Sequence, residues 1–287
     1  MDLTLVDTRY LHDGVYKKAG NKTFLDITPA DEAILKDTSP GYRVLNLQDP
    51  FNEARTSNFH SSLGGYHGAK MRRYQDLISL HLVPEIQQII QDKKITEANT
   101  NVISMLNAKY IMAGLQANAV IPNPYANGAA WFAKEVKAVA SPDEEIKALE
   151  DVDLSSTAVI DQSKFEVPDI KTDSTARIAL TEYQPNRLVY EASTSTNSLA
   201  IFSEIYYPKG WKAYVDGKET EIIQANYVLR ALPLSSGKHQ IEFRFEPAAY
   251  YIGNKVMMVS SLVLLLVIGY GFFRLWKHAK VSTPMSA

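Results

Sequence analysis

Beyond about residue 172 the chain alternates between apolar and polar positions with a period of two residues. In KHQIEFRFEP, Ile241, Phe243 and Phe245 fall on one side, and the residues between them fall on the other. This period is typical of a strand with one buried face. Turn signals separate several such runs: Gln-Pro-Asn at 184–186, Asp-Gly at 216–217 and Ser-Ser-Gly at 235–237. We predict an antiparallel β-sandwich over residues 172–247.

Residues 1–171 mix helical periods with short strands instead. Thr28-Pro29 and Ser141-Pro142 each combine an N-cap residue with a proline suited to the first helical turn. A helical stripe covers residues 69–91, and we expect Pro84 to split it. Further predictions are strands at 42–47, around Tyr110 and at 129–139, a short helix before Tyr110, and a long loop at 49–68. The expected fold class is therefore α+β, with a mixed α/β region ahead of the sandwich.

Residues 256–273 form an uncharged apolar run that is long enough to cross a ~30 Å hydrocarbon core as a helix. Tyr250 and Tyr251 precede this run and Trp276 follows it, which suits aromatic anchoring at both interfaces. The alternative is a buried core helix. We predict a transmembrane helix at 248–276, followed by a cytoplasmic tail at 277–287.

The charges beside the span predict its orientation. Arg274, Lys277 and Lys280 follow it, whereas Arg244 and Lys255 are the nearby cations before it. This bias places the main domain outside the cytoplasm. The first residues, however, lack the apolar core of a signal peptide. Two explanations remain open: the chain is the C-terminal piece of a larger membrane protein, or it is tail-anchored in the reverse orientation.

The composition of the chain excludes several classes of binding and catalysis. A formal net charge of -2 gives no overall basic field for nucleic acid, and the absence of cysteine excludes disulfides, Cys-ligated zinc and thiol catalysis. The six histidines show no metal-binding spacing, and GxSxG, P-loop and dinucleotide-binding motifs are absent. We expect no metal, no cofactor and no nucleic-acid partner.

A glycine-rich stretch, SSLGGYHGAKMRRYQDL, leads directly into a predicted helix. Arginine can hold phosphate or carboxylate with two hydrogen bonds, and loop N–H groups can add to that. The alternative is a salt bridge to Asp76 or to an acidic residue elsewhere. The candidates for an anion or lipid-phosphate site are Gly64, Gly65, His67, Lys70, Arg72 and Arg73.

Aromatic residues crowd one predicted hairpin of the sandwich. Their rings could stack on sugars, because each offers a flat apolar face with a polar edge. The alternative is ordinary core packing, above all for Trp211. The candidates for glycan stacking are Tyr206, Tyr207, Trp211 and Tyr214.

Four stretches together resemble the C-terminal part of the YfhO family of bacterial membrane proteins. They are LGGYHGAKMRRYQDLI, NVISMLNAKYIM, NPYANGAAWFAKEV and YYPKGWKAYVDGKETEIIQANYVLRALPLSSGKHQIEFRFEP, with the span that follows. The resemblance implies a polytopic protein of the GT-C glycosyltransferase type in the bacterial inner (cytoplasmic) membrane. Such proteins use lipid-phosphate-linked sugars to glycosylate cell-envelope polymers.

The same resemblance implies that the catalytic carboxylate lies in an early loop that is not part of this chain. We therefore assign no catalytic residue, and expect the chain to be an extracytoplasmic portion with the last membrane span. Its expected partners are membrane lipid, a polyprenyl-phosphate-linked sugar, an envelope glycan and the upstream transmembrane helices of the full-length protein. The alternative function is a non-enzymatic, membrane-anchored module that binds glycan or protein.

Overall fold

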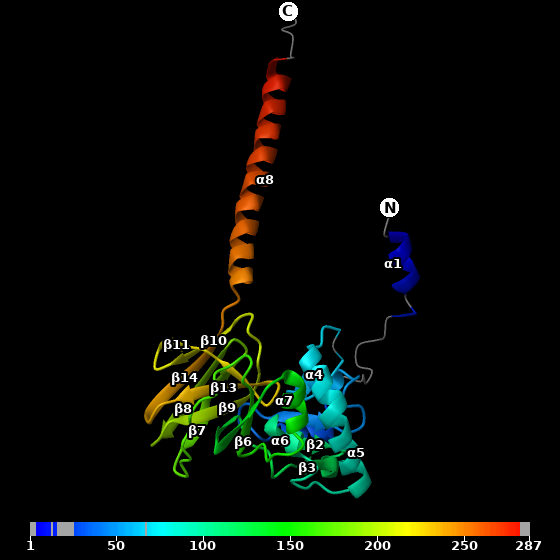
Figure 1. The fold of residues 1–287 in the computed structure, drawn as a ribbon. Helices are drawn as coiled ribbons and strands as arrows, with labels where there is room; N and C mark the ends of the chain where they lie inside the picture. Colours follow the sequence, from blue (N-terminus) through cyan, green and yellow to red (C-terminus); the bar gives the residue numbers. More distant parts are fainter. Residues whose placement is uncertain (1–3, 13, 16–25, 67, 282–287) are drawn as a thin grey trace, which may run out of the picture.

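A computed structural model describes residues 4–12, 14–15, 26–66 and 68–281. Two parts lie side by side, a mixed α/β part and a β-sandwich, and a long helix leaves the sandwich at one end (Figure 1). The predicted α+β class with a mostly antiparallel sandwich and one C-terminal helix of membrane length is confirmed.

The α/β part is built from short elements. Its three-stranded sheet has the order β1-β2-β3, in which β1 and β2 are parallel and β3 is antiparallel to β2, while β5 and β6 form a separate parallel pair. Its helices are α1 (Thr4–Tyr10), α2 (Pro29–Ile34), α3 (Arg55–Phe59), α4 (Arg72–Leu77), the π-helix η1 (Ile78–Leu82), α5 (Val83–Asp92), α6 (Asn101–Met105), the 3-10 helix η2 (Ala117–Ala119) and α7 (Pro142–Ala148). Its strands are β1 (Arg43–Asn46), β2 (Ala108–Met112), β3 (Val120–Pro122), β5 (Glu135–Val139) and β6 (Thr157–Asp161).

The sandwich consists of a five-stranded sheet in the order β11-β10-β14-β8-β7 and a four-stranded sheet in the order β12-β13-β9-β4. All pairings within these two sheets are antiparallel. The strands are β4 (Ala130–Ala133), β7 (Arg177–Gln184), β8 (Arg187–Thr194), β9 (Ser198–Ile205), β10 (Trp211–Val215), β11 (Lys218–Thr220), β12 (Ile223–Ala225), β13 (Leu229–Leu234) and β14 (Gly237–Phe245).

The four-stranded sheet is shared by two hydrophobic cores. On β9, Phe202 packs in the sandwich core with Tyr190 and Phe243, and the Phe202 ring centroid lies 4.8 Å from that of each of these two rings. The neighbouring side chains Leu199 and Ile201 belong to the other core, with the helices of the α/β part. Because successive side chains of a strand point to opposite faces, one apolar strand serves both cores. The sandwich is thus packed against the α/β part over a whole sheet face.

Local signals in the sequence explain several elements. Thr28 and Asp31 form a reciprocal capping box at the start of α2, and the Ser141 hydroxyl accepts from the Glu144 N–H at the start of α7. Asp216 and Gly217 both adopt positive φ in the tight turn between β10 and β11. These predicted helix starts and this hairpin are confirmed.

Three local predictions were wrong. The strand expected at 129–139 is two strands, because β4 pairs with β9 in the sandwich while β5 pairs with β6 elsewhere. Pro84 does not split the helical run: it lies in the first turn of α5, directly after the π-helix η1, whose wider turn suits the missing proline N–H. The loop expected at 49–68 contains α3.

The strand β4 also bears on the predicted boundary between residues 171 and 172. It lies upstream of that boundary and forms the edge of the four-stranded sheet beside β9. The domain boundary between residues 171 and 172 stays a prediction.

The helix α8 (Ala248–Val281) follows β14 after a short connection. Among the described residues, Ala248–Lys277 is the stretch whose length and apolar composition suit a membrane span. None of its apolar window is buried within the chain, so α8 is not a core helix of this protein. The short connection means that the end of the sandwich where β14 finishes is the end next to the membrane.

Candidate functional site

In the glycine-rich loop, residues 64–66 pack against the chain at 50–57. A side chain at Gly64 would place its Cβ atom 1.5 Å from the Pro50 carbonyl oxygen, so no other residue fits there. Gly65 has a φ of +106°, in the region that glycine favours. The N–H group of Gly65 donates to Pro50 and that of Tyr66 donates to Glu53, each over 3.1 Å. These glycines therefore have a structural role, and their N–H groups are already used.

Arg73 points into the protein. Its Nη1 lies 3.0 Å from the Glu145 carboxylate and 2.8 Å from the Tyr227 carbonyl oxygen, and its guanidinium covers the Tyr227 ring at 4.4 Å from the ring centroid. The side chain of Glu145 is only 1% exposed. Burial raises the pKa of Glu145, and Arg73 acts in the opposite direction. Arg73 thus forms the internal ion pair that the sequence left open as an alternative.

Arg72, one residue earlier, points outward. Its side chain is 94% exposed and lies 4.0 Å from Asp76, one turn along the same helix. Lys70 extends near the Phe51 ring, with its Nζ atom 5.9 Å from the ring centroid. His67 lies outside the described residues. Of the cations predicted at this site, Lys70 and Arg72 are the two with accessible positions.

A cavity of about 410 Å³ opens beside this loop. Gly64, Gly65 and Lys70 line it together with Arg43 and Tyr74. Arg43 is held by Glu204 at 3.4 Å, and the Tyr74 hydroxyl donates to the Leu63 carbonyl oxygen. Burial raises the pKa of Tyr74 to about 12, so this hydroxyl stays protonated. The cavity is a mainly apolar groove with Lys70 at its wall, which suits a ligand that joins an apolar part to an anion. We call it the Lys70 groove.

The four aromatic candidates do not form a single stacking platform. Trp211 and Tyr214 both lie on β10, but Trp211 packs toward the sandwich core and stacks on Arg230, whose guanidinium carbon is 4.2 Å from the ring centroid. On Tyr214, Arg244 covers one ring face and the hydroxyl donates to Glu246. Glycan stacking at these two positions stays a prediction, but the geometry gives both rings internal contacts.

Tyr206 and Tyr207 lie on the loop between β9 and β10. The Tyr206 ring meets the edge of Phe165, and its N–H donates to the Val228 carbonyl oxygen over 2.7 Å. The side chain of Tyr207 is accessible, with 39% of the residue exposed. Of the four candidates, Tyr207 is thus the one whose ring has the fewest described contacts with the rest of the chain.

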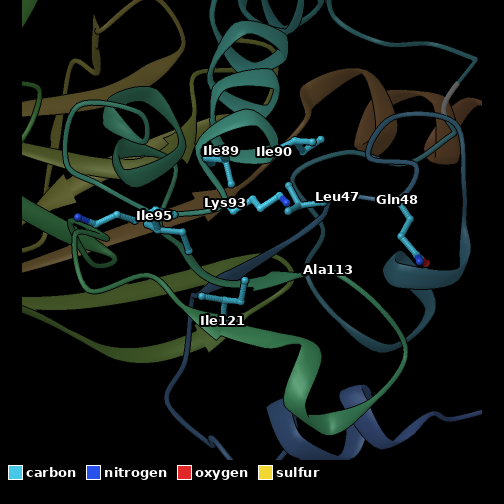
Figure 2. A pocket seen from close by; sticks show the side chains of 9 residues that line it. Leu47, Gln48, Ile89, Ile90, Lys93, Ile95, Ala113 and Ile121 are labelled. Atoms are coloured by element: carbon cyan, nitrogen blue, oxygen red, sulfur yellow. The ribbon is translucent and has the colours of Figure 1, made fainter.

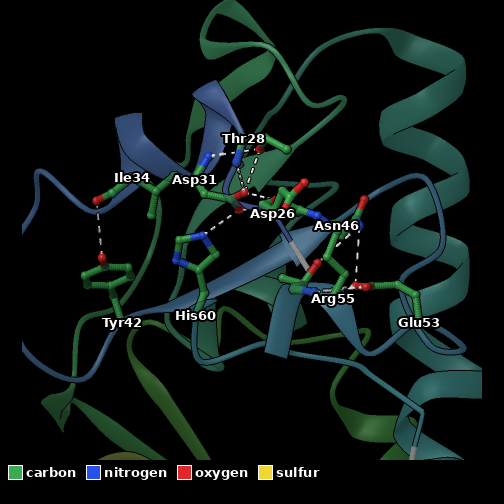
Figure 3. A network of polar contacts seen from close by, with 10 residues as sticks. Asp26, Thr28, Asp31, Ile34, Tyr42, Asn46, Glu53, Arg55 and His60 are labelled. Carbon is green, nitrogen blue, oxygen red and sulfur yellow. Dashed lines mark hydrogen bonds and ion pairs between the residues drawn. The ribbon is translucent and has the colours of Figure 1, made fainter. Parts of the chain in front are cut away.

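The sequence did not predict a buried polar network near α2, which Figure 3 shows. Asp31 is fully buried and pairs with Arg55, and its other oxygen lies 3.0 Å from the His60 ring nitrogen. Burial opposes the charge of Asp31, but hydrogen bonds from Arg55, Thr28 and His60 outweigh it and lower the pKa to about 2. The network fastens α3 and its flanking loop to α2. The local signal was the capping box alone, because Arg55 and His60 are distant in sequence.

A second groove, of about 460 Å³, is lined by aliphatic side chains at the end of α5 (Figure 2). Lys93 and Lys94 stand at its wall. Within the part of the chain that the structure describes, no cluster of three or more His, Asp or Glu residues could hold a metal ion.

Residues 152–256 match the model of the family described as "Bacterial membrane protein YfhO". Over these residues the chain is similar to the YfhO family. The YfhO match covers β6, the sandwich strands β7 to β14 and the start of α8. No curated protein and no solved structure matches the chain. The YfhO resemblance is therefore confirmed for residues 152–256, while every residue that lines the Lys70 groove except Ile205 lies outside the match.

Proposed function

We propose that this YfhO-family chain is the extracytoplasmic portion and last membrane span of a GT-C-type glycosyltransferase that uses a lipid-phosphate-linked sugar in the bacterial inner membrane. In this proposal the catalytic carboxylate lies in an early loop between upstream transmembrane helices. The chain itself holds the lipid phosphate, or an anionic envelope glycan, at Lys70 and Arg72. The observation that carries the proposal is the position of the Lys70 groove, at the end of the molecule from which α8 leaves.

Two features of the fold support this position of the groove. Ile205, at the end of β9 next to the membrane, lines the Lys70 groove together with Gly64 and Lys70. The loop at 206–210 joins Ile205 to Trp211, which pairs with Phe245, so Ile205 lies at the same end of the sandwich as Phe245, just before α8. A phosphate at the bilayer surface would therefore be near Lys70, while an attached apolar chain could lie along the groove.

The charges suit a phosphate rather than a neutral ligand. Arg43 and Arg73 are engaged by Glu204 and Glu145, whereas Arg72 is exposed and Lys70 is half-buried at the groove wall. A cation held in the fold by a carboxylate contributes little net charge to an incoming anion. Lys70 and Arg72 supply the attraction, and salt should screen it.

The test uses the full chain in lipid nanodiscs and a fluorescent polyprenyl-phosphate analogue. Replacing both Lys70 and Arg72 by Gln should weaken binding at least ~10-fold and flatten its salt dependence. The matched control is Lys171→Gln with Lys238→Gln, which removes two exposed cations at the opposite end of the sandwich. Equal affinities for the two double variants would refute the proposal.

The orientation has a separate test. Ser236 lies in the exposed turn between β13 and β14. The chain has no cysteine, so Ser236→Cys in the full-length protein should react with a membrane-impermeant thiol reagent in intact spheroplasts. Labelling only after lysis would place the domain in the cytoplasm.

A further inference from the structure

The register of the sandwich defines which loops face the bilayer. β14 ends at Phe245, and α8 begins at Ala248, so the Phe245 end must lie at the membrane surface if α8 spans the bilayer. Trp211 pairs with Phe245, and Arg187 pairs with Arg244. The turn before β8 and the loop before β10 are therefore at this end. The turn at 235–237 lies at the other end of β14, about 30 Å away for a nine-residue strand.

The loop at 206–210 is attached to the start of the connection to α8. The Glu246 N–H donates to the Gly210 carbonyl oxygen over 2.7 Å. A side chain at Gly210 would meet the Phe245 ring at 2.5 Å, so the loop is closely packed there. This loop carries Tyr207 and Lys209, both of which are exposed. Its height above the membrane is thus set by the same strand that leads into α8.

The α/β part contributes a second loop at the same end, visible beside α4 in Figure 1. Tyr66 is 77% exposed, and Met71 and Arg72 are exposed next to it. This loop lies beside the membrane-side end of the four-stranded sheet. Arg73, just after the loop, donates to the Tyr227 carbonyl oxygen, and Ile205 lines the same groove as Lys70. Two separate parts of the fold therefore present a tyrosine and a cation on the same side as α8.

The composition of these two loops matches a bilayer surface. Tyrosine places an apolar ring and a polar hydroxyl at headgroup level, methionine adds apolar surface, and Lys or Arg attracts anionic headgroups. Of the nearby carboxylates, Glu246 accepts from Tyr214 and Asp76 accepts from Tyr227, while Glu221 is exposed. We propose that Tyr66, Met71 and Arg72, on one loop and the start of α4, and Tyr207 and Lys209, on the other loop, dock on the anionic bilayer surface, so that the domain contacts the membrane at two places besides α8.

This inference goes beyond the proposed function because its partner is the bilayer itself and not a lipid-linked substrate. Docking at three separate places would stop the domain from tilting about the short connection at 246–247. The Lys70 groove would then keep a constant height above the headgroups, whichever ligand it holds.

The experiment uses single cysteines, since the chain has none of its own. Spin labels are attached to Tyr66→Cys, Tyr207→Cys and the control Ser236→Cys, in the full chain reconstituted into vesicles of phosphatidylcholine and phosphatidylglycerol. Collisions with membrane-soluble oxygen and with an aqueous nickel chelate report the depth of each label. Labels at 66 and 207 should favour oxygen, and the label at 236 should favour nickel. Labels at 66 and 207 that are as open to nickel as the control would overturn the proposal.

A second measurement tests the role of charge. Arg72→Gln with Lys209→Gln should shift the label at 207 toward nickel accessibility in anionic vesicles, whereas Lys171→Gln with Lys238→Gln should leave it unchanged. Equal depth in the two double variants would overturn the assignment to anionic headgroups. Because these vesicles contain no polyprenyl phosphate, failure here leaves ligand binding at the Lys70 groove intact, and loss of ligand binding leaves the depth result intact.

Discussion

Arg72 and Arg73 are neighbours at the start of α4, and their side chains have opposite environments. Arg73 is turned inward onto the buried Glu145, and Arg72 is turned outward into solvent. A helix rotates by about 100° per residue, so adjacent arginines at its start need not share a face. Burial, and not proximity in sequence, therefore separates a charge that stabilises the fold from one that is available to a ligand.

The largest expected effect comes from breaking the buried member of this pair. Arg73→Gln should lower the free energy of unfolding by about 3–5 kcal/mol, because it leaves Glu145 buried without its cation. Arg72→Gln should change it by about 0–1 kcal/mol. Urea denaturation of both variants measures the difference, and similar losses would show that the two arginines are not in different environments.

Glu85 is a buried carboxylate like Glu145, but among the described residues it has no cation as a partner. It accepts hydrogen bonds from the N–H groups of Val102 and Ile103 instead. Burial raises its pKa from 4.5 to about 7, against these two hydrogen bonds. The folded state therefore binds the proton more tightly than the unfolded state. Stability should fall as the pH rises from about 4.5 to 7, by up to ~3 kcal/mol.

Unfolding free energies measured across this pH range test the point. Glu85→Gln should remove most of the slope, whereas Glu97→Gln, an exposed carboxylate nearby in sequence, should preserve it. A slope that survives in Glu85→Gln would assign the proton to another group.

Asp31 shows the opposite behaviour, because its hydrogen bonds lower the pKa from 3.8 to about 2. The unfolded state binds the proton more tightly, so this contribution is present above pH 3.8 and is lost as the pH falls toward 2. It amounts to about 2 kcal/mol. Asp31→Asn should lose that part of the acid dependence, as followed by circular dichroism; an unchanged acid limb would exclude Asp31 as its source.

The smallest effect on stability is expected for the cations beside the Lys70 groove. Replacing Lys70 and Arg72 together by Gln should shift the free energy of unfolding by less than ~1 kcal/mol, because Arg72 is exposed and Lys70 is only half-buried, so neither substitution strands a buried charge. Thermal melting of the nanodisc-bound chain checks this. A loss comparable with that of Arg73→Gln would mean that Lys70 or Arg72 belongs to the fold.

The sequence predicted the features whose signals are local. The alternation around Phe243, the turn at Asp216 and the N-cap Ser141 all act within a few residues, and the structure confirms them. Pairing between strands that are distant in sequence could not be predicted, because no local signal shows that β4 pairs with β9 or that β5 pairs with β6. Periodicity also could not show that Pro84 follows a π-helical turn.

For the candidate site, too, the sequence predicted local features but not the contacts between distant residues. The sequence located the basic stretch, but the separation of Arg73 from Arg72 depends on Glu145 and Tyr227, which lie 72 and 154 residues away. The glycines looked like a ligand cradle, whereas Gly64 is required by its contact with Pro50. The Asp31 network likewise joins residues that only the fold brings together.

The central claim is that Lys70 and Arg72, the cations beside the Lys70 groove, meet a lipid phosphate at the membrane surface. Photo-crosslinking tests it most directly, with a polyprenyl phosphate that carries a diazirine near its phosphate and with the full chain in nanodiscs. Mass spectrometry of the digested protein should find the label within residues 61–74, reduced when Lys70 and Arg72 are both Gln. Label found on α8 alone, or unchanged in that variant, would contradict the claim.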